Sequence, residues 1–511
     1  MVNQKGGAKM IKRIINIFKK GGAKLGMVDE INKIVDHPRI AVDDREYDRI
    51  IENKWIYESQ FPDVKYLDAD GHERTRPFRN LNVTKVVARK LSKLIFNEGV
   101  TIESDNPVVD EFIKEVFENN KFRKNFGEEL EAGYSIGGLA IRPYYDPNTN
   151  QIKISYAQAD SFFPLQSNIN DISEAVFVSQ DTVTEESIKV YYTLYEFHTW
   201  NGANYVIENE LYRSEKVDRV GFRVRLDSFE KYEELEPITT LENFTRPLFT
   251  YIKLAGKNNN DLNSPMSLGI IDNSKQQFRD INEVYDMFMH ETKKSGRKII
   301  ASDQFFRTKF TEDGRPFHTL DRHDDTFRRV RTDNMDDFEM KEFLPSLRQN
   351  EFIEIIDFLL RFIEVQTGFS TGTFSFDGSS VKTATEVIAE NSDTYSTRQD
   401  NVLIVQDAIR ELIISMLELA ESHDLLTIPD SYSINIDFDD GVFESKESKL
   451  EFYSKAHAGG FIPAKETMQR IFGVSEEEAK EWFVEIMNEQ MGVDPMEQEK
   501  QAEEDLYGPE E

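Results

Sequence analysis

Apolar and polar positions along the chain follow first a helical period, then a strand period, and then a helical period again. Apolar residues recur at helical spacing around Trp55, from Leu81 to Phe96 and from Val108 to Gly133. The segment before Leu81 carries the turn signal Asp70–Gly71, which predicts a loop or a hairpin. From 135 to 229 apolar and polar residues alternate and Tyr, Val and Phe are frequent, which predicts antiparallel strands. The predicted fold class is therefore α+β.

The second half of the chain predicts long helices separated by an insert and a loop. Residues 267–295 and 347–366 have helical periodicity, and 297–345 between them predicts a small α/β insert with short strands. Residues 381–423 contain no Pro or Gly, so one unbroken helix there would extend about 60 Å. A rod of this length, next to a loop rich in Gly, Ser, Thr and Phe, favours a large assembly with a lumen. One strand at 431–440 and two or three short helices within 446–490 follow.

Composition narrows the classes of protein. The 511 residues are 39% hydrophobic and 31% charged, which predicts two to four folded domains. Cysteine is absent, so disulfides and thiolate chemistry are excluded. No apolar run is long enough to predict a transmembrane helix. The net charge of −32 argues against tight binding of DNA to a general basic surface, but an acidic wall that surrounds DNA without holding it remains compatible.

Charge is concentrated at the two ends of the chain. Residues 1–24 hold seven Lys or Arg and no acid, and their central segment predicts a short basic amphipathic helix. This arm is interpreted as a docking or partly disordered segment, with contact to a membrane surface as the alternative. Residues 476–511 carry fourteen acids, and the last twenty or so predict a solvated acidic tail.

One motif resembles a catalytic site. Gly368-Phe369-Ser370-Thr371-Gly372 matches the G-x-S-x-G pattern of hydrolases, in which Ser370 would be the nucleophile. That motif requires a strand before the serine and a helix directly after it, whereas here a helix precedes and a loop follows. No phosphate-binding glycine loop occurs, and His318 and His323 flanking Asp321 are weak evidence for a metal. The sequence therefore predicts no catalytic residues, no metal and no cofactor.

Two charged groups of residues are candidates for contacts with partners. On the helix at 347–366 a mostly acidic stripe is formed at a spacing of three or four residues by Glu351, Glu354, Asp357, Arg361 and Glu364. The stripe is either the wet side of a buried helix or the lining of a channel. In the insert, three cations lie among acids, namely Arg328, Arg329 and Arg331. They are either a solvated strand face or a surface for an acidic or phosphate-bearing partner.

The order of these segments resembles a known family. The segments that carry the resemblance are GGAKLGMVDEINKIVDHPRI at 21–40, VKTATEV at 381–387 and AHAGGFIPAKETMQRIFGVSEEEAKEWFVEIMNEQ at 456–490. Together with the order helix, charged insert, helix, loop, long helix and acidic helical end, they resemble the portal protein of tailed bacteriophages. The likeness covers roughly 21–490 and is closest to the siphophage type found with Gram-positive hosts.

The resemblance implies a portal fold that assembles as a ring of about twelve subunits at one capsid vertex. It divides the chain into a basic N-terminal arm 1–45, a wing 46–265, a first stem helix 266–295, a clip 296–346, a second stem helix 347–367, a tunnel loop 368–380, a long wing helix 381–424, a wing strand 425–445, crown helices 446–490 and an acidic tail 491–511.

The resemblance also implies function and partners. A portal is the channel for packaging and ejection of double-stranded DNA, and it is the docking platform for the large terminase subunit and then for head-completion adaptors. Its other partners are the major capsid protein and, as an option, a scaffold protein. It resides in the virion, is assembled in the host cytoplasm and has no membrane partner.

The implied site residues fall in three groups. The tunnel-loop residues that would face DNA are Thr371, Thr373, Phe374, Ser375, Phe376 and Lys382. The acidic stripe would line the channel, and Arg328, Arg329 and Arg331 would form the partner surface of the clip. Two alternatives remain, a structural capsid or adaptor protein without a channel and, more distantly, a hydrolase that uses Ser370.

Overall fold

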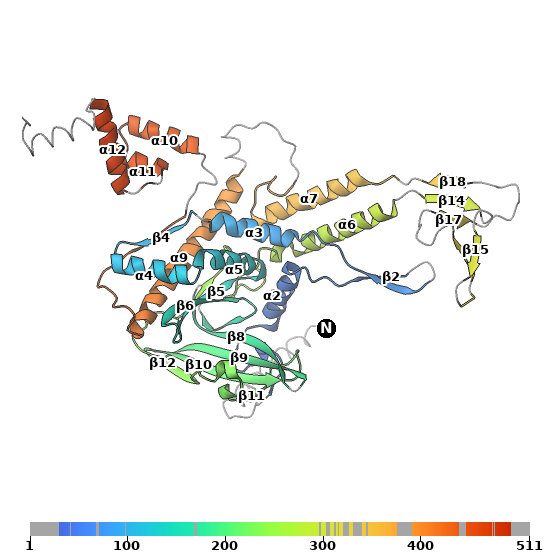
Figure 1. Ribbon diagram of the computed structural model, residues 1–511, viewed down its shortest axis with the longest axis horizontal. Coiled ribbons are helices and arrows are strands. Elements are labelled where there is room, and N and C mark those ends of the chain that lie inside the picture. The colour runs from blue at the N-terminus through green and yellow to red at the C-terminus, as the bar shows by residue number, and fades with distance from the viewer. Residues whose placement is uncertain are drawn as a thin grey trace, which may run out of the picture. The chain divides into compact units, whose positions relative to one another are not determined.

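The computed structural model describes most of the chain. The described residues are 30–40, 42–67, 71–97, 99–167, 171–185, 187–295, 298–302, 307–310, 313–314, 316–319, 327–330, 340–343, 346–375, 391–438, 446–472, 474 and 476–491. The chain divides into two compact units, Met1–Asp437 and Phe438–Glu511, which are described separately. Along the chain a group of helices is followed by a group of strands and then by further helices, as the sequence predicts, so the α+β class is confirmed (Figure 1).

Helices open the first unit after a short strand. They are α2 (Asp44–Tyr57), α3 (Val83–Ile95), α4 (Pro107–Asn119) and α5 (Phe122–Ile136), and a hairpin of β2 (Val64–Leu67) and β3 (Glu73–Arg76) lies between the first two. The prediction of one helix from Val108 to Gly133 is wrong. The chain breaks at Asn120, whose side chain donates to the carbonyls of Val116 at 2.7 Å and of Ile152 at 3.0 Å, and Lys121 takes a left-handed conformation with φ of 48°.

Antiparallel sheets form the centre of the first unit. The largest sheet has the order β1-β11-β10-β9-β8-β7, with β12 paired to β10. Its strands are β1 (Glu30–Ile31), β7 (Phe162–Ser167), β8 (Ile172–Glu185), β9 (Ile188–Asn201), β10 (Asn204–Ser214), β11 (Gly221–Val224) and β12 (Ile238–Leu241). Consecutive residues of β9 belong to different cores, because Leu194 packs in one cluster and Tyr195 in another. Both faces of this sheet are therefore partly covered.

Smaller sheets connect the helices to the largest sheet. Strands β13 (Thr250–Ile252), β5 (Leu139–Asp146) and β6 (Gln151–Gln158) form one, and β4 (Thr101–Ser104) pairs with β19 (Ile434–Asp437). Against them lies α9 (Ser392–Ser422), which buries Val405, Ile409 and Met416. The predicted helix 381–423 is thus described from Ser392 onward, and residues 381–390 lie outside the described part.

The first helix of the second half begins later than its periodicity predicts. Residues 267–271 are not helical, and a short 3₁₀ turn, η4 (Asp272–Ser274), leads into α6 (Lys275–Lys294). The chain before η4 runs against the end of α5, where the N–H of Ile270 donates to the carbonyl of Tyr134 at 2.7 Å. A Cβ at Gly269 would collide with the carbonyl of Ser135, so the close approach of the two backbones requires glycine.

The insert and the second unit complete the described structure. Strand β14 (Lys298–Ser302) pairs in parallel with β17 (Phe327–Val330) and antiparallel with β18 (Met340–Phe343), while β15 (Arg307–Phe310) pairs with β16 (Pro316–Thr319). The helix after the insert is α7 (Gln349–Thr367). In the second unit the helices are α10 (Lys446–Ala458), α11 (Ala464–Phe472) and α12 (Glu476–Met491), in agreement with the predicted short helices.

Candidate functional site

The helices on either side of the insert form an antiparallel hairpin. The rings of Phe288 on α6 and Phe352 on α7 pack with centroids 5.2 Å apart. At the same level Nε of Arg348 donates to Oε1 of Glu291 at 3.1 Å. The end of α6 therefore lies beside the start of α7, and the two helices run side by side (Figure 1). The structure thus brings together the two helices that the resemblance designates as the stem.

The start of the loop after α7 is fixed by a glycine. Gly368 has φ of +76°, and the N–H of the next residue, Phe369, donates to the carbonyl of Glu364 at 2.8 Å, as in a Schellman motif. The hydroxyl of Thr397 on α9 donates to the carbonyl of Gly368 at 2.7 Å, and a Cβ at Gly368 would collide with that hydroxyl. Both the backbone conformation and the close approach of α9 therefore require glycine.

A buried carboxylate holds the rest of the described loop. Glu364 is 0% exposed, and its side chain accepts hydrogen bonds from the backbone N–H groups of Gly372 at 3.1 Å, Phe374 at 2.5 Å and Ser375 at 2.7 Å. The hydroxyl of Ser375 donates to the same carboxylate at 3.0 Å. Such charge-assisted bonds are stronger than neutral ones and offset the cost of burying the charge. We call this group of contacts the loop anchor.

Ser370 connects the loop to the first turn of α9. It is 2% exposed, its hydroxyl accepts from the backbone N–H of Thr394 at 3.2 Å, and its own N–H donates to the hydroxyl of Thr394 at 2.8 Å. These reciprocal bonds satisfy an N–H at the start of a helix, which has no partner inside the helix. In the described structure Ser370 is thus a buried cap of α9, and its surroundings explain why the G-x-S-x-G match is coincidental.

The acidic stripe on α7 is not uniform. Glu351 and Glu354 are exposed, and Asp357 forms an ion pair with Arg361 at 2.9 Å. The expectation that Glu364 belongs to the same exposed stripe is wrong. Its spacing fits the stripe, but the helix ends one turn later and the following loop folds back over its carboxylate.

The predicted tunnel-loop residues differ in accessibility. Thr371 is exposed, Thr373 and Phe374 are partly buried, and Ser375 is 8% exposed. Phe374 packs edge-on against Phe369, with ring centroids 5.0 Å apart. Two further predicted residues, Phe376 and Lys382, lie outside the described residues. Of the described members, Thr371 is the one most free to contact a partner.

The predicted clip arginines are only partly described. Arg328 and Arg329 lie in β17 opposite Ile300 and Ala301 of β14, and nothing is described of their side chains. Arg331 lies outside the described residues, as do Asp321 and His323 of the weak metal motif. Among the residues that are described, no group of three His, Asp or Glu could hold a metal ion.

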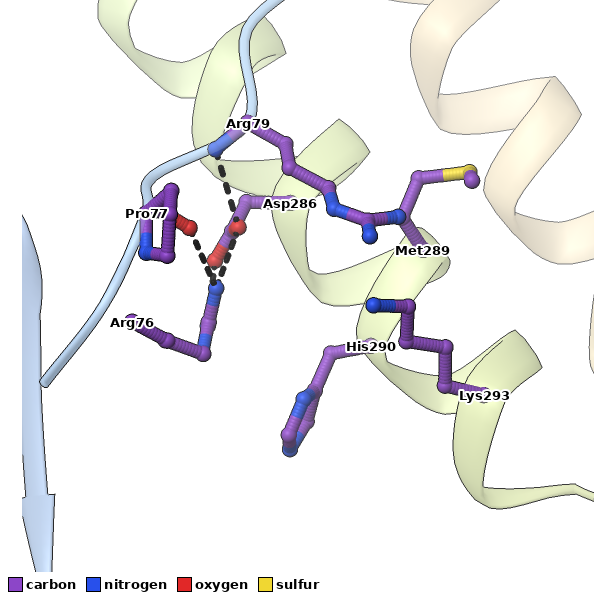
Figure 2. A pocket seen from close by; sticks show the side chains of 7 residues that line it. All are labelled: Arg76, Pro77, Arg79, Asp286, Met289, His290 and Lys293. Atoms are coloured by element: carbon purple, nitrogen blue, oxygen red, sulfur yellow. Dashed lines mark hydrogen bonds and ion pairs between the residues drawn. The ribbon is translucent and has the colours of Figure 1, made fainter. Parts of the chain in front are cut away.

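A cationic pocket that the sequence did not predict lies on α6. It has a volume of about 190 Å³ and is lined by Arg76, Pro77, Arg79, Asp286, Met289, His290 and Lys293. Figure 2 shows the side chains of Arg79 and Lys293 extending over α6 on the same side as Asp286 and His290. Arg76 forms a bidentate ion pair with Asp286, with both N–O distances 2.6 Å, and these hydrogen bonds hold the pKa of Asp286 below its ordinary value.

Burial and the neighbouring cations Lys294 and Arg76 lower the pKa of His290. The pocket therefore stays positively charged through its arginines and Lys293 rather than through the histidine. No sequence signal marked this site, because Arg76 and Asp286 are 210 positions apart.

The fold and site define a class of protein. A helical hairpin that carries an insert, an anchored loop after it and a long helix packed across a β layer follow one another in the order expected of a portal, a channel-forming structural protein of a virus head. A family model confirms this class, since the one described as phage portal protein, SPP1 Gp6-like, matches residues 36–492. The chain therefore belongs to the family of SPP1 Gp6-like phage portal proteins. No curated protein matches it significantly.

Family membership decides several of the sequence-based expectations. The portal fold, the function in the DNA packaging channel and the location at the capsid vertex of the virion follow from it. The family is structural and not enzymatic, so the hydrolase alternative is wrong, and so is the alternative of a capsid or adaptor protein without a channel. In the described part of the chain, no helix is long and apolar enough to cross a bilayer.

Proposed function

We propose that about twelve copies of this chain form a closed ring around double-stranded DNA and that the α6–α7 hairpins build the narrow part of its channel. The observation that carries this proposal is an apolar stripe on α7, at a spacing of three or four residues, that the chain itself leaves exposed. Its members are Ile355 at 46%, Phe358 at 63%, Phe362 at 44% and Val365 at 69% exposure. A helix with such a stripe needs a covering surface, and a neighbouring copy supplies one.

Electron microscopy of the purified protein, together with its mass in solution, tests the ring. We expect closed rings with a central hole wide enough for duplex DNA. A uniform monomer of 59.4 kDa, in the presence as well as the absence of its capsid proteins, would contradict the proposal.

The channel wall is proposed to include the exposed Glu351 and Glu354 of the acidic stripe and, beside them, the ion pair of Asp357 with Arg361. Together with a net charge of −32 per copy, the two glutamates make a surface along which phosphates are repelled and duplex DNA slides. The loop 368–380 is proposed to face the DNA, with Thr371, Thr373, Phe374 and Phe376 as its contacts and Lys382, two residues after the loop, as the nearest cation. The prediction that Ser375 also faces DNA is not supported, because its side chain is buried and its hydroxyl is bonded to Glu364. The loop anchor supports this role because it holds the described part of the loop in one conformation.

The insert 296–346 is proposed to be the clip that binds the large terminase subunit during packaging and a head-completion adaptor afterwards. Charge reversal of Arg328, Arg329 and Arg331 should weaken binding to these partners while rings still form. Unchanged binding in a pull-down with purified terminase and adaptor would remove these arginines from the partner surface.

The remaining domains and partners are proposed from the same resemblance to portal proteins. The wing is proposed to comprise 46–265, 381–424 and 425–445, and the crown 446–490. Contacts with the major capsid protein, and with scaffold where one exists, are proposed for the outside of the ring, and the phage is proposed to be a siphophage of a Gram-positive host. DNA ejection through the same channel and assembly in the host cytoplasm complete the proposal.

A further inference from the structure

The described residues that line the pocket on α6 carry more positive than negative charge. Asp286 is the acid that lines it, and both oxygens of that carboxylate are engaged by Arg76. Within the described ranges, no carboxylate pairs with the guanidinium of Arg79 or the ammonium of Lys293. A concave surface with an excess of positive charge, in a chain with a net charge of −32, is complementary to an oxyanion or a carboxylate.

The pocket lies on the side of α6 that faces away from α7. Phe288 marks the α7-facing side through its contact with Phe352. At roughly 100° per residue, Asp286, His290 and Lys293 lie about 140–160° around the helix from Phe288. The segment 76–79 of the same chain packs on this side of α6, and the pocket opens between that segment and the helix. We call the exposed part of this side the free α6 side.

The free side of α7 is acidic and apolar. By the same geometry Glu354 lies about 160° and Phe358 about 120° from Phe352 around the helix. Glu351 and Glu354 are exposed, and neither has an ion pair among the residues that the structure describes. Phe358 is 63% exposed and Val365 69%, so this side has apolar surface that the described part of the chain leaves uncovered.

The two free sides carry their complementary charges at the same level of the hairpin. Phe288 lies opposite Phe352, and Glu291 lies opposite Arg348. Consequently Glu351 and Glu354 lie level with the turns of α6 that carry the pocket. Rotation about the axis of a closed ring moves a subunit sideways without raising it. In a ring whose hairpins run along its axis, the free α6 side of one copy would therefore meet the free α7 side of the next at this level.

We propose that the cationic pocket of each copy receives the carboxylate of Glu354, with Glu351 beside it, from α7 of the neighbouring copy. This inference rests on the proposed ring. A neighbouring copy held in the ring presents its carboxylate at a high effective concentration, which favours it over free phosphate. Glu351 and Glu354 would lie where the helices of two neighbouring copies meet, and such a position borders both the neighbour and the channel. The contact is therefore compatible with a channel-lining role.

The absence of cysteine from the chain makes cross-linking a direct test. His290→Cys combined with Glu351→Cys should give, on mild oxidation of assembled rings, a ladder of covalent oligomers that collapses on reduction, because these two positions differ by only about one residue in level along the hairpin. Glu351 is exposed and His290 is partly exposed, so the substitutions leave the core intact. The matched control pairs His290→Cys with Gln366→Cys, which is exposed on the same helix about 22 Å from Glu351, and should give no ladder.

Charge reversal gives a second readout. Arg79→Glu with Lys293→Glu, or Glu351→Lys with Glu354→Lys, should each raise the protein concentration needed for half-assembly about tenfold, and all four changes together should restore it. Lys294→Glu changes the same charge on the same helical turn without lining the pocket, and it should assemble normally.

Each outcome decides the inference. Rings that give no ladder and tolerate both reversals would overturn the inference while the proposed ring stands. Normal assembly combined with lower retention of DNA in the pocket variant would overturn it by identifying a DNA phosphate as the occupant. If the wild-type chain forms no ring at all, the proposed function fails and this inference fails with it.

Discussion

At the scale of single residues, Glu364 shows why spacing alone misassigns a side chain. Its position three residues after Arg361 and seven after Asp357 places it on the acidic stripe of α7. In the structure the loop folds over it and it accepts three backbone N–H groups and one hydroxyl. One signal was present in the sequence, because an acid in the last turn of a helix opposes the helix dipole and so points to donors elsewhere.

Replacing Glu364 with glutamine should loosen the loop anchor. The amide keeps the size of the side chain, but its NH₂ group faces backbone N–H donors that lose their acceptor, so the free energy of unfolding should fall by about 2–3 kcal/mol. Denaturant unfolding measures the loss, and hydrogen exchange at residues 372–375 should become faster. Glu354→Gln, an exposed position, is the control and should stay within about 0.5 kcal/mol. Equal stability of the two variants would contradict the anchor.

The ion pair between Arg76 and Asp286 predicts a dependence of stability on pH. The pKa of Asp286 is lowered in the folded protein, chiefly by hydrogen bonds from Arg76, and the carboxylate is only 7% exposed. A carboxyl group with a lowered folded pKa stabilises the fold above its unfolded pKa of about 4, and this contribution is lost as the pH falls through the folded value.

Thermal unfolding of the wild type and of Asp286→Asn between pH 3 and pH 7 checks the sign. The wild type should be the more stable protein at pH 7, and the difference should shrink towards acid pH. A difference that is constant across this range would show that the carboxylate charge does not contribute.

At the scale of elements, the described part of the loop after α7, residues 368–375, is bonded to both α7 and α9. Gly368 ends α7, Glu364 holds residues 372–375, and Ser370 caps α9. These residues therefore couple the end of α7 to the start of α9. The exposed Thr371 is the position where its contact with DNA can be changed without disturbing these bonds.

Thr371→Glu should weaken DNA handling and leave assembly intact. A carboxylate on each subunit near passing duplex repels phosphates at a constriction, so particles should contain less DNA or lose it sooner. Thr371→Val keeps the shape without the charge and is the control. The measurement is packaged DNA per particle, with rings counted by electron microscopy. DNA content equal to that of wild type would place Thr371 away from the duplex.

At the scale of the whole molecule, the net charge predicts that the protein binds DNA weakly, although DNA passes through its channel. A chain with 94 acids and 62 Lys or Arg gains little from the release of counterions, which drives most non-specific binding. Isolated rings should therefore give no gel shift with a short duplex below about 10 µM protein at physiological salt. Tight binding that weakens steeply with added salt would show a basic surface that the net charge conceals.

The sequence by itself determined the α+β class, the position of most helices and strands, and the order that resembles a portal. It could do so because apolar periodicity and turn residues are local properties of the chain. Only the tertiary structure decided which charged residues are buried or paired. Glu364 meets its donors through the folding of a loop, and Arg76 meets Asp286 across 210 positions. Contacts of this kind depend on how elements pack, and the spacing of residues along one element does not contain that information.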